Sequence, residues 1–282
     1  MLDKLALGTV QFGLDYGVKN YSGRVLLNEA YSILEFAKGI GIDTLDTASG
    51  YGKSESVLGE IGVSDYRIIT KTVSIDKGIN KVLEGFYNSL ESLRVECLEG
   101  LLVHHFTDVK KKEFNLLFNN LTRLKQDGLI EKIGFSVYTP DQVDFLLSNF
   151  DFDLIQLPFN VFDNRLVLGG QLNALRNRSI EIHARSIFLQ GILVDFENLP
   201  AYFSNWHGRF RLYKSFVQEY RMSLLEYALN FALNTQEIDK VLVGVNNQQQ
   251  LREIVKAAKR MEGLKSFPIN DEDLLNPSRW KT

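Results

Sequence analysis

Eight short apolar runs alternate with longer amphipathic segments along almost the whole chain, and this alternation most constrains the fold. Several runs are nearly continuous in apolar character, which is typical of parallel strands buried on both faces. The runs begin at Lys4, Asp43, Arg67, Leu98, Lys132, Asp153, Glu181 and Lys240. Eight strands that alternate with helices predict an α/β fold, namely a parallel, eight-stranded (β/α)8 TIM barrel rather than an open doubly wound sheet.

The segments between the runs carry helical signals. Residues 28–39 repeat apolar side chains at helical spacing and end at Gly39, a residue suited to a helix C-cap. Residues 113–127 show the same spacing. Another helix is predicted to begin at Pro140, with Thr139 as its N-cap.

The chain of 282 residues is long enough for two domains or for one barrel, since such barrels reach ~250 residues as one unit. No linker rich in Pro, Ser or Gly divides it, so we predict a single domain over residues 1–282. The longest segment that interrupts the alternation of apolar runs and amphipathic segments is an aromatic insertion at residues 189–212. Two interpretations stay open: it shapes a substrate pocket or forms a lid, or it packs onto the barrel as a short extra helix.

Composition excludes several classes of protein. The net charge of −3 gives no electrostatic reason to expect binding to nucleic acid or to an anionic membrane. No window approaches the ~20 uncharged apolar residues of a membrane span. The one cysteine, Cys97, cannot form an internal disulfide, so we expect a reducing, cytoplasmic location. Because Cys97 enters an apolar run, we expect its thiol to be buried.

Four polar residues in the first part of the chain end or follow successive apolar runs: Asp46, Tyr51, Lys71 and His104. If those runs are neighbouring parallel strands, their carboxyl ends lie side by side and the four groups meet in one pocket. A phenol has a pKa of ~10, which a nearby lysine ammonium lowers by stabilising the phenolate. The cluster therefore predicts a proton-donating enzyme site. Alone, Asp46 and Lys71 are also compatible with a structural ion pair.

The segment from Gly41 to Glu55, G-I-D-T-L-D-T-A-S-G-Y-G-K-S-E, resembles the D-x-A-x-x-Y-G-x-S-E signature of the aldo-keto reductases. These are barrel enzymes that use NADPH or NADH to reduce carbonyl compounds. The resemblance continues in collinear order through I-I-T-K, L-L-V-H-H, K-I-G-F-S, L-I-Q-L-P-F-N and V-G-V-N-N-Q-Q-Q-L-R-E. It covers almost the whole chain, and the ordered set of landmarks is far more specific than any one segment.

The resemblance implies that Tyr51 is the general acid that protonates the substrate oxygen as hydride reaches the carbon. Lys71 would supply the charge that assists Tyr51, and Asp46 would hold Lys71 protonated and oriented. His104 would donate a hydrogen bond to the carbonyl oxygen. The adjacent His105 is a rival, but alternation along a strand is expected to send the two rings to opposite sides.

The resemblance also implies a nicotinamide cofactor, NADPH or NADH. Gly8 and Thr9 would let backbone approach the nicotinamide, with Ser136 and Gln156 bonding its carboxamide. The residues implied for the pyrophosphate loop and the adenosine side are Ser186, Leu189, Gly191, Gly244, Asn246, Gln250 and Glu253. No G-x-G-x-x-G follows a strand, so a Rossmann site is not indicated.

Some positions depart from the family pattern. Arg185 takes the place where the family often stacks an aromatic ring on the nicotinamide, and Arg185 therefore counts among the expected cofactor-binding residues. Gln250 stands where many members place an arginine on the 2′-phosphate of NADPH. Arg252 would replace that arginine only if the loop shifted. The loss of a charge-assisted contact leaves the choice between NADPH and NADH open.

Two other functions stay open, and so do several structural details. Lys71 is also suited to be the Schiff-base nucleophile of a class I aldolase barrel, and a nicotinamide-binding regulatory barrel with little turnover is the second alternative. The expected partner is a small-molecule carbonyl substrate; its identity and the oligomeric state are not predicted. The residues expected to line the substrate pocket are Tyr16, Phe106, Tyr138 and Phe159. The chain lacks a hairpin before its first strand, so the barrel base is expected to be covered by the tail around Leu274, Leu275 and Trp280, or by a partner subunit.

Overall fold

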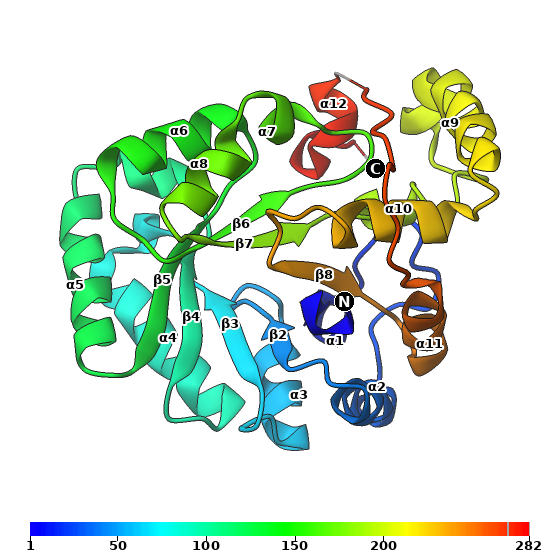
Figure 1. Ribbon diagram of the computed structural model, residues 1–282. Helices are drawn as coiled ribbons and strands as arrows, with labels where there is room; N and C mark the ends of the chain where they lie inside the picture. Colours follow the sequence, from blue (N-terminus) through cyan, green and yellow to red (C-terminus); the bar gives the residue numbers. More distant parts are fainter. Residues whose placement is uncertain (270, 282) are drawn as a thin grey trace.

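The computed structural model describes residues 1–269 and 271–281, and its centre is a closed barrel of eight parallel strands (Figure 1). The strands are β1 (Leu5–Gly8), β2 (Thr44–Asp46), β3 (Arg67–Lys71), β4 (Leu98–Val103), β5 (Ile130–Ser136), β6 (Leu154–Pro158), β7 (Glu181–Arg185) and β8 (Lys240–Gly244). Each strand pairs in parallel with the next, and β8 closes the barrel on β1. The predicted TIM barrel is confirmed.

Helices follow the strands around the outside of the barrel (Figure 1). They are α1 (Val10–Gly13), α2 (Leu27–Gly39), α3 (Ser54–Ile61), α4 (Ile79–Leu93), α5 (Phe114–Gln126), α6 (Pro140–Asn149), α7 (Arg165–Leu168), α8 (Gln171–Asn177), α9 (His207–Glu219), α10 (Leu224–Leu233), α11 (Gln248–Ala257) and α12 (Glu272–Leu275). In the described part of the chain, none of these helices combines the length and apolar character needed to cross a membrane.

The helices predicted at residues 28–39, at residues 113–127 and from Pro140 are confirmed to within one residue at each end. One detail differs. Gly39 is the last residue of α2 rather than its cap, and the positive φ of +83° falls at Gly41. The left-handed turn that ends this helix is therefore made two residues later than predicted.

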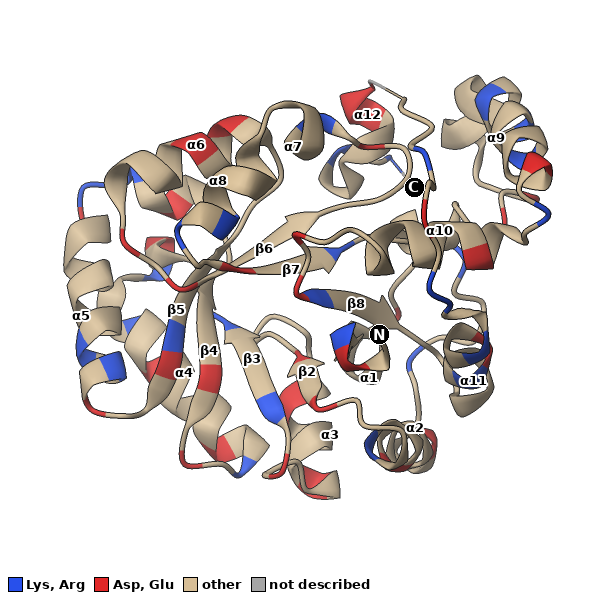
Figure 2. Ribbon diagram, viewed as in Figure 1, with Lys and Arg blue, Asp and Glu red and all other residues tan. Residues whose placement is uncertain are grey.

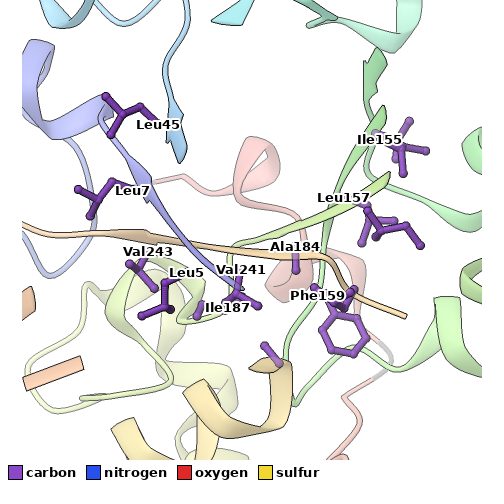
Figure 3. Close-up of a cluster of buried hydrophobic side chains, with 14 of the residues drawn as sticks. Leu5, Leu7, Leu45, Ile155, Leu157, Phe159, Ala184, Ile187, Val241 and Val243 are labelled. Carbon is purple, nitrogen blue, oxygen red and sulfur yellow. The ribbon is translucent and has the colours of Figure 1, made fainter. Parts of the chain in front are cut away.

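The apolar core has two parts. Outward-facing strand residues pack beneath the helices, and Figure 3 shows Leu5 and Leu7 of β1 close to Val241 and Val243 of β8 in this layer. A separate small cluster joins Ile69, Leu102 and Leu154. Because these three come from β3, β4 and β6, and β3 and β6 do not pair with each other, their side chains meet inside the barrel.

The burial predicted for Cys97 is wrong, since its side chain is exposed. The residue lies in the connection between α4 and β4, one position before the strand begins at Leu98. Leu98 is only 1% exposed, so the buried part of the chain begins with the first residue of β4 and not with the preceding Cys97.

The aromatic insertion at residues 189–212 holds short 3-10 segments at Leu189–Gly191 and Ala201–Trp206 and the first turns of α9. Phe203 and Phe210 are fully buried. The Trp206 indole Nε1 donates a hydrogen bond to Asp271 Oδ2 at 2.9 Å. These aromatic residues pack in the core, as one of the two interpretations expects, whereas Gln190, Gly191, Val194 and Asp195 of the same insertion line the large cavity.

The C-terminal tail does not cover the barrel base, so the first of the two expectations for that end is wrong, and cover by a partner subunit stays a prediction. Phe267 and Ile269 donate backbone hydrogen bonds to Val161 and Phe162, which follow the carboxyl end of β6. The Trp280 ring packs edge-on against Phe203 at 5.0 Å between centroids. The tail therefore lies on the same side of the barrel as the insertion.

Charged residues instead lie near the beginnings of the strands (Figure 2), and their side chains form ion pairs there. The Lys132 ammonium contacts both Glu99 and Glu181, and Arg67 contacts Glu99 at 2.6 Å. The Lys240 ammonium also donates to the backbone oxygen of Asp3, in the short 3-10 segment Leu2–Lys4, at 2.8 Å. Each of these ions has an opposite charge in contact, as half-buried charges require.

Acid is expected to weaken this network through Glu181. Burial acts to raise the Glu181 pKa, but hydrogen bonds from His183 and Lys132 outweigh it and lower the pKa from 4.5 to about 2. The depressed value means that the stabilisation is complete above pH 4.5 and is lost as the pH falls toward 2. Glu181→Gln should reduce the free energy of unfolding at pH 7 by about 1–3 kcal/mol.

The measurement is urea unfolding of wild type and variant at several pH values. The difference between them should shrink as the pH falls toward 2. The exposed Glu131→Gln serves as a matched control and should change stability little at any pH. Equal stability of wild type and Glu181→Gln at pH 7 would contradict the stabilising role.

Candidate active site

The four side chains predicted to form the proton-donating site lie together at the carboxyl end of the barrel. Asp46 ends β2, Lys71 ends β3, and His104 directly follows β4. Tyr51 lies in the loop between β2 and α3. All four line one cavity of about 570 Å³. This is the arrangement expected where neighbouring parallel strands end at the same rim.

Lys71 is buried and every proton of its ammonium group has an acceptor. Its Nζ donates to Asp46 Oδ1 at 2.7 Å, to Asp46 Oδ2 at 2.8 Å and to the Thr47 carbonyl at 2.8 Å. Burial opposes the charged form, but Asp46 and Tyr51 outweigh it and raise the pKa of Lys71. Lys71 is therefore a fixed cation, and its Nζ lies 5.1 Å from the centroid of the Tyr51 ring.

Burial raises the pKa of Tyr51, and the Lys71 charge acts in the opposite direction without cancelling that effect. The predicted effect of Lys71 has the right sign, but the net direction is opposite to the predicted lowering. The reason is that sequence patterns do not show how deeply the phenol is enclosed. Tyr51 consequently keeps its proton at neutral pH, which a proton donor must do.

His104 is also neutral. Burial and then the Lys71 charge lower its pKa from 6.5 to about 3. Its ring meets the Tyr51 ring edge-on, at 6.2 Å between centroids and 82° between planes. A neutral imidazole in this position keeps one N–H to donate.

The argument that separated His104 from His105 is wrong, although the choice of His104 agrees with the geometry. The two rings are stacked at 4.8 Å rather than turned to opposite sides. Strand β4 ends at Val103, so alternation no longer applies to the two histidines. His105 is exposed and is not among the residues that line the cavity.

Gln156, which was expected only to bind the cofactor, also belongs to the cluster of polar groups. Its contact with Asp46 is the feature that sequence reasoning missed. Its Nε2 donates to Asp46 Oδ2 at 2.6 Å. The residue lies two positions after Leu154 on β6, so alternation places it on the inner face of the barrel. Asp46 thus accepts hydrogen bonds from Lys71 and from Gln156, which fixes the carboxylate between two strands.

Two glycines allow the loop that carries Tyr51 to pack closely on α1. A Cβ added to Gly13 would lie 1.7 Å from the Tyr51 carbonyl oxygen. Gly52 adopts a φ of +58°, and a Cβ there would lie 2.7 Å from the Gly13 oxygen. Only glycine fits this contact, which sets the position of the Tyr51 backbone.

Most residues expected to bind a cofactor line the same cavity as the four polar groups. They are Gly8, Thr9, Ser136, Gln156, Arg185, Ser186, Gly191, Gly244, Asn246, Gln250 and Glu253. Leu189 was also expected to bind the cofactor, but it is not among the residues that line the cavity. Its side chain is fully buried in the apolar core, whereas the other residues of the loop 186–191 line the cavity.

Sequence reasoning missed Gln11, which lies in the cavity together with the expected residue Asn246. The Oε1 of Gln11 and the Oδ1 of Asn246 are buried acceptors without a hydrogen-bond partner within residues 1–269 and 271–281. Both residues line the cavity. Buried acceptors are normally satisfied, so these two fit a polar ligand that brings hydroxyl or amide donors.

The loop after β1 and the insertion after β7 meet beside the cavity. Lys19 forms an ion pair with Asp195 at 2.7 Å, and the Val18 amide donates to Gln190 Oε1 at 3.2 Å. These partners are more than 170 positions apart in the sequence, so no local pattern indicates that they meet. Lys19, Gln190 and Asp195 all line the cavity.

The expected substrate-side aromatics divide into two groups. Tyr16 and Tyr138 line the cavity, as predicted. Phe106 and Phe159 do not, because Phe106 packs against Phe145 and Phe159 stacks on Phe231 at 5.4 Å.

The Aldo/keto reductase family model matches residues 4–265. The chain belongs to this family. A glyoxal reductase of Bacillus subtilis is 27% identical over 234 residues, which are 76% of this chain and 83% of that protein. An L-galactose dehydrogenase of Arabidopsis thaliana is 25% identical over 270 residues, which are 86% of this chain and 82% of that protein.

Solved structures of family members share the fold. The holo form of an aldo-keto reductase from Bacillus halodurans superposes with a TM-score of 0.74 at 19% identity, covering 99% of this chain and 94% of that chain. A glycerol dehydrogenase from Gluconobacter oxydans superposes with a TM-score of 0.71 at 19% identity, covering 92% and 88%. Family membership supports oxidoreduction of a carbonyl compound.

The close packing at Gly13 is testable by substitution. Gly13→Ala forces its Cβ into the Tyr51 carbonyl, so the free energy of unfolding should fall by about 1–3 kcal/mol. Gly39→Ala is the matched control, because a Cβ at that position in α2 meets no atom within 4 Å. The control should leave stability unchanged or raise it by up to ~1 kcal/mol. Equal thermal midpoints for wild type and Gly13→Ala would refute the contact.

Proposed function

We propose that this chain reduces an aldehyde or ketone to an alcohol, with hydride from a nicotinamide cofactor and a proton from Tyr51. The observation that carries the proposal is the Lys71–Asp46 ion pair, with its ammonium 5.1 Å from the Tyr51 ring in a cavity that His104 also lines. Relatives that are named as a reductase and as a dehydrogenase support oxidoreduction as the reaction class.

Each group of the cluster has a distinct role. Tyr51 holds a proton at neutral pH and gives it to the substrate oxygen. Lys71 stabilises the phenolate that remains, because a cation close to a new negative charge lowers its free energy most in a site with little water. Asp46 keeps Lys71 charged and in place, and Gln156 in turn orients Asp46. The neutral His104 donates its N–H to the substrate oxygen and aligns it.

The cavity fits a nicotinamide cofactor in its chemistry. The unpartnered acceptors of Gln11 and Asn246 suit ribose hydroxyl groups, and the loop at Ser186 and Gly191 offers backbone N–H groups and small side chains to a diphosphate. Ser136 and Gln156 would hold the carboxamide. When bound, the reduced cofactor supplies the hydride.

The Schiff-base alternative is disfavoured by the state of Lys71. A nucleophilic lysine needs a free lone pair, whereas all three protons of this ammonium are donated and its pKa is raised. Borohydride trapping with a carbonyl substrate should therefore leave no adduct on the chain. The regulatory alternative predicts cofactor binding without turnover, which steady-state assays against a panel of carbonyl compounds distinguish.

Removing the phenolic proton tests the proposal directly. Tyr51→Phe should lose at least ~100-fold in carbonyl reduction, because no other group is placed to protonate the oxygen as effectively. The dissociation constant for the cofactor should stay within a few-fold of wild type. Tyr87→Phe, an exposed tyrosine of α4, is the control and should keep full activity. Unchanged turnover of Tyr51→Phe would remove the mechanism.

We also propose that NADH binds at least as well as NADPH. Gln250 and Glu253 of α11 line the cavity, whereas Arg252 does not. The Arg252 guanidinium stacks on Phe36 at 4.1 Å and its Nε donates to Gln248. A carboxylate at Glu253 repels a 2′-phosphate and can accept a hydrogen bond from a ribose hydroxyl.

The ratio of the dissociation constants for NADPH and NADH, measured by cofactor fluorescence, checks this preference. Gln250→Arg should shift the ratio about tenfold toward NADPH by adding a charge-assisted contact. Gln218→Arg places the same charge on the exposed face of α9 and should leave the ratio unchanged. A strong preference of the wild type for NADPH would contradict the assignment.

A further inference from the structure

Arg185 brings a guanidinium group into the cavity at the carboxyl end of β7. Its Nη2 donates to the Val137 carbonyl at 2.9 Å and its Nη1 to Ser186 Oγ at 3.3 Å. The guanidinium carbon lies 4.2 Å from the centroid of the Tyr138 ring. These contacts hold a planar cation in one place while leaving it half-buried at the cavity wall.

The charge of Arg185 is not compensated in the way that other cavity cations are. Lys71 is paired with Asp46, and Lys19 with Asp195. By contrast, the described part of the chain places no carboxylate oxygen within 4.0 Å of Arg185, and its contacts are all neutral. The part of the cavity next to the catalytic cluster therefore carries one positive charge in excess.

This excess charge reaches the reacting groups. Arg185 contributes to lowering the pKa of His104, and it opposes the burial that raises the pKa of Tyr51. Both groups face the place where the substrate oxygen must lie. Any ring that delivers hydride to the adjacent carbon has to touch that carbon, so it too lies within Coulombic range of Arg185.

We propose that Arg185 sets the redox preference of the cavity by favouring the neutral dihydronicotinamide over the cationic nicotinamide, and so holds the bound cofactor in its reduced form. The inference rests on the proposed function. In reduction the carbonyl carbon gains a hydride and its oxygen gains the Tyr51 proton, while the nicotinamide ring is left with a positive charge. An uncompensated cation raises the free energy of that charged ring and leaves the neutral ring almost unaffected.

Cofactor binding in the absence of substrate tests this without relying on turnover. The dissociation constants of NADH and NAD⁺, and of NADPH and NADP⁺, are measured by fluorescence and by competition. The variants are Arg185→Gln, which removes the charge, and Arg185→Lys, which keeps it. Arg209→Gln removes an exposed cation of α9 and controls for the overall charge of the chain.

We expect the wild type to bind the reduced form more tightly than the oxidised form of the same cofactor. Arg185→Gln should reduce that preference about tenfold, equal to ~1.4 kcal/mol, mainly by tighter binding of the oxidised form. Arg185→Lys should retain most of the preference, and Arg209→Gln all of it.

Two results would overturn the inference. One is an unchanged ratio in Arg185→Gln, and the other is an equal weakening of both forms, which would make Arg185 only a support for Val137 and Tyr138. If the wild type binds none of the four nucleotides, the proposed function itself fails. If the nucleotides bind but the ratio of the dissociation constants for the oxidised and reduced forms does not change in Arg185→Gln, only this inference is rejected and the proposed function stands.

Discussion

The buried ion pair between Lys71 and Asp46 is the interaction on which the rest of the site depends. Two charges removed from water destabilise a fold unless each finds several partners. Lys71 has three acceptors, and Asp46 also accepts a hydrogen bond from Gln156. The pair thus joins β2, β3 and β6 at the barrel rim and places a permanent cation beside the Tyr51 ring.

Burial and that cation together determine the protonation state of the neighbours. Tyr51 keeps its proton because it is enclosed, and His104 stays neutral because it is enclosed and also faces positive charge. The cluster is therefore composed of one charged pair and two neutral donors. Such an arrangement is suited to giving a proton to an oxygen that becomes negative.

The strands and the position of the four polar groups could be predicted because both follow from local patterns: apolar runs, and the rule that parallel strands share one rim. Features that depend on contacts between distant segments could not be predicted from the sequence. The bond from Gln156 to Asp46, the ion pair of Lys19 with Asp195 and the packing of the tail join residues over 100 positions apart or segments with no shared motif. The burial of Cys97 and the orientation of the His105 ring do not follow strand rules, because each residue lies one or two positions outside β4.

The two rims of the barrel differ in what their charges accomplish. At the base, the cations Lys132 and Arg67 pair with the carboxylates of Glu99 and Glu181. At the opposite rim the charges surround a cavity. Separate residues of the same strands therefore serve the two ends of the barrel. Loops at the carboxyl end of such a barrel can change the substrate that it accepts, while the ion pairs at the base continue to stabilise the fold.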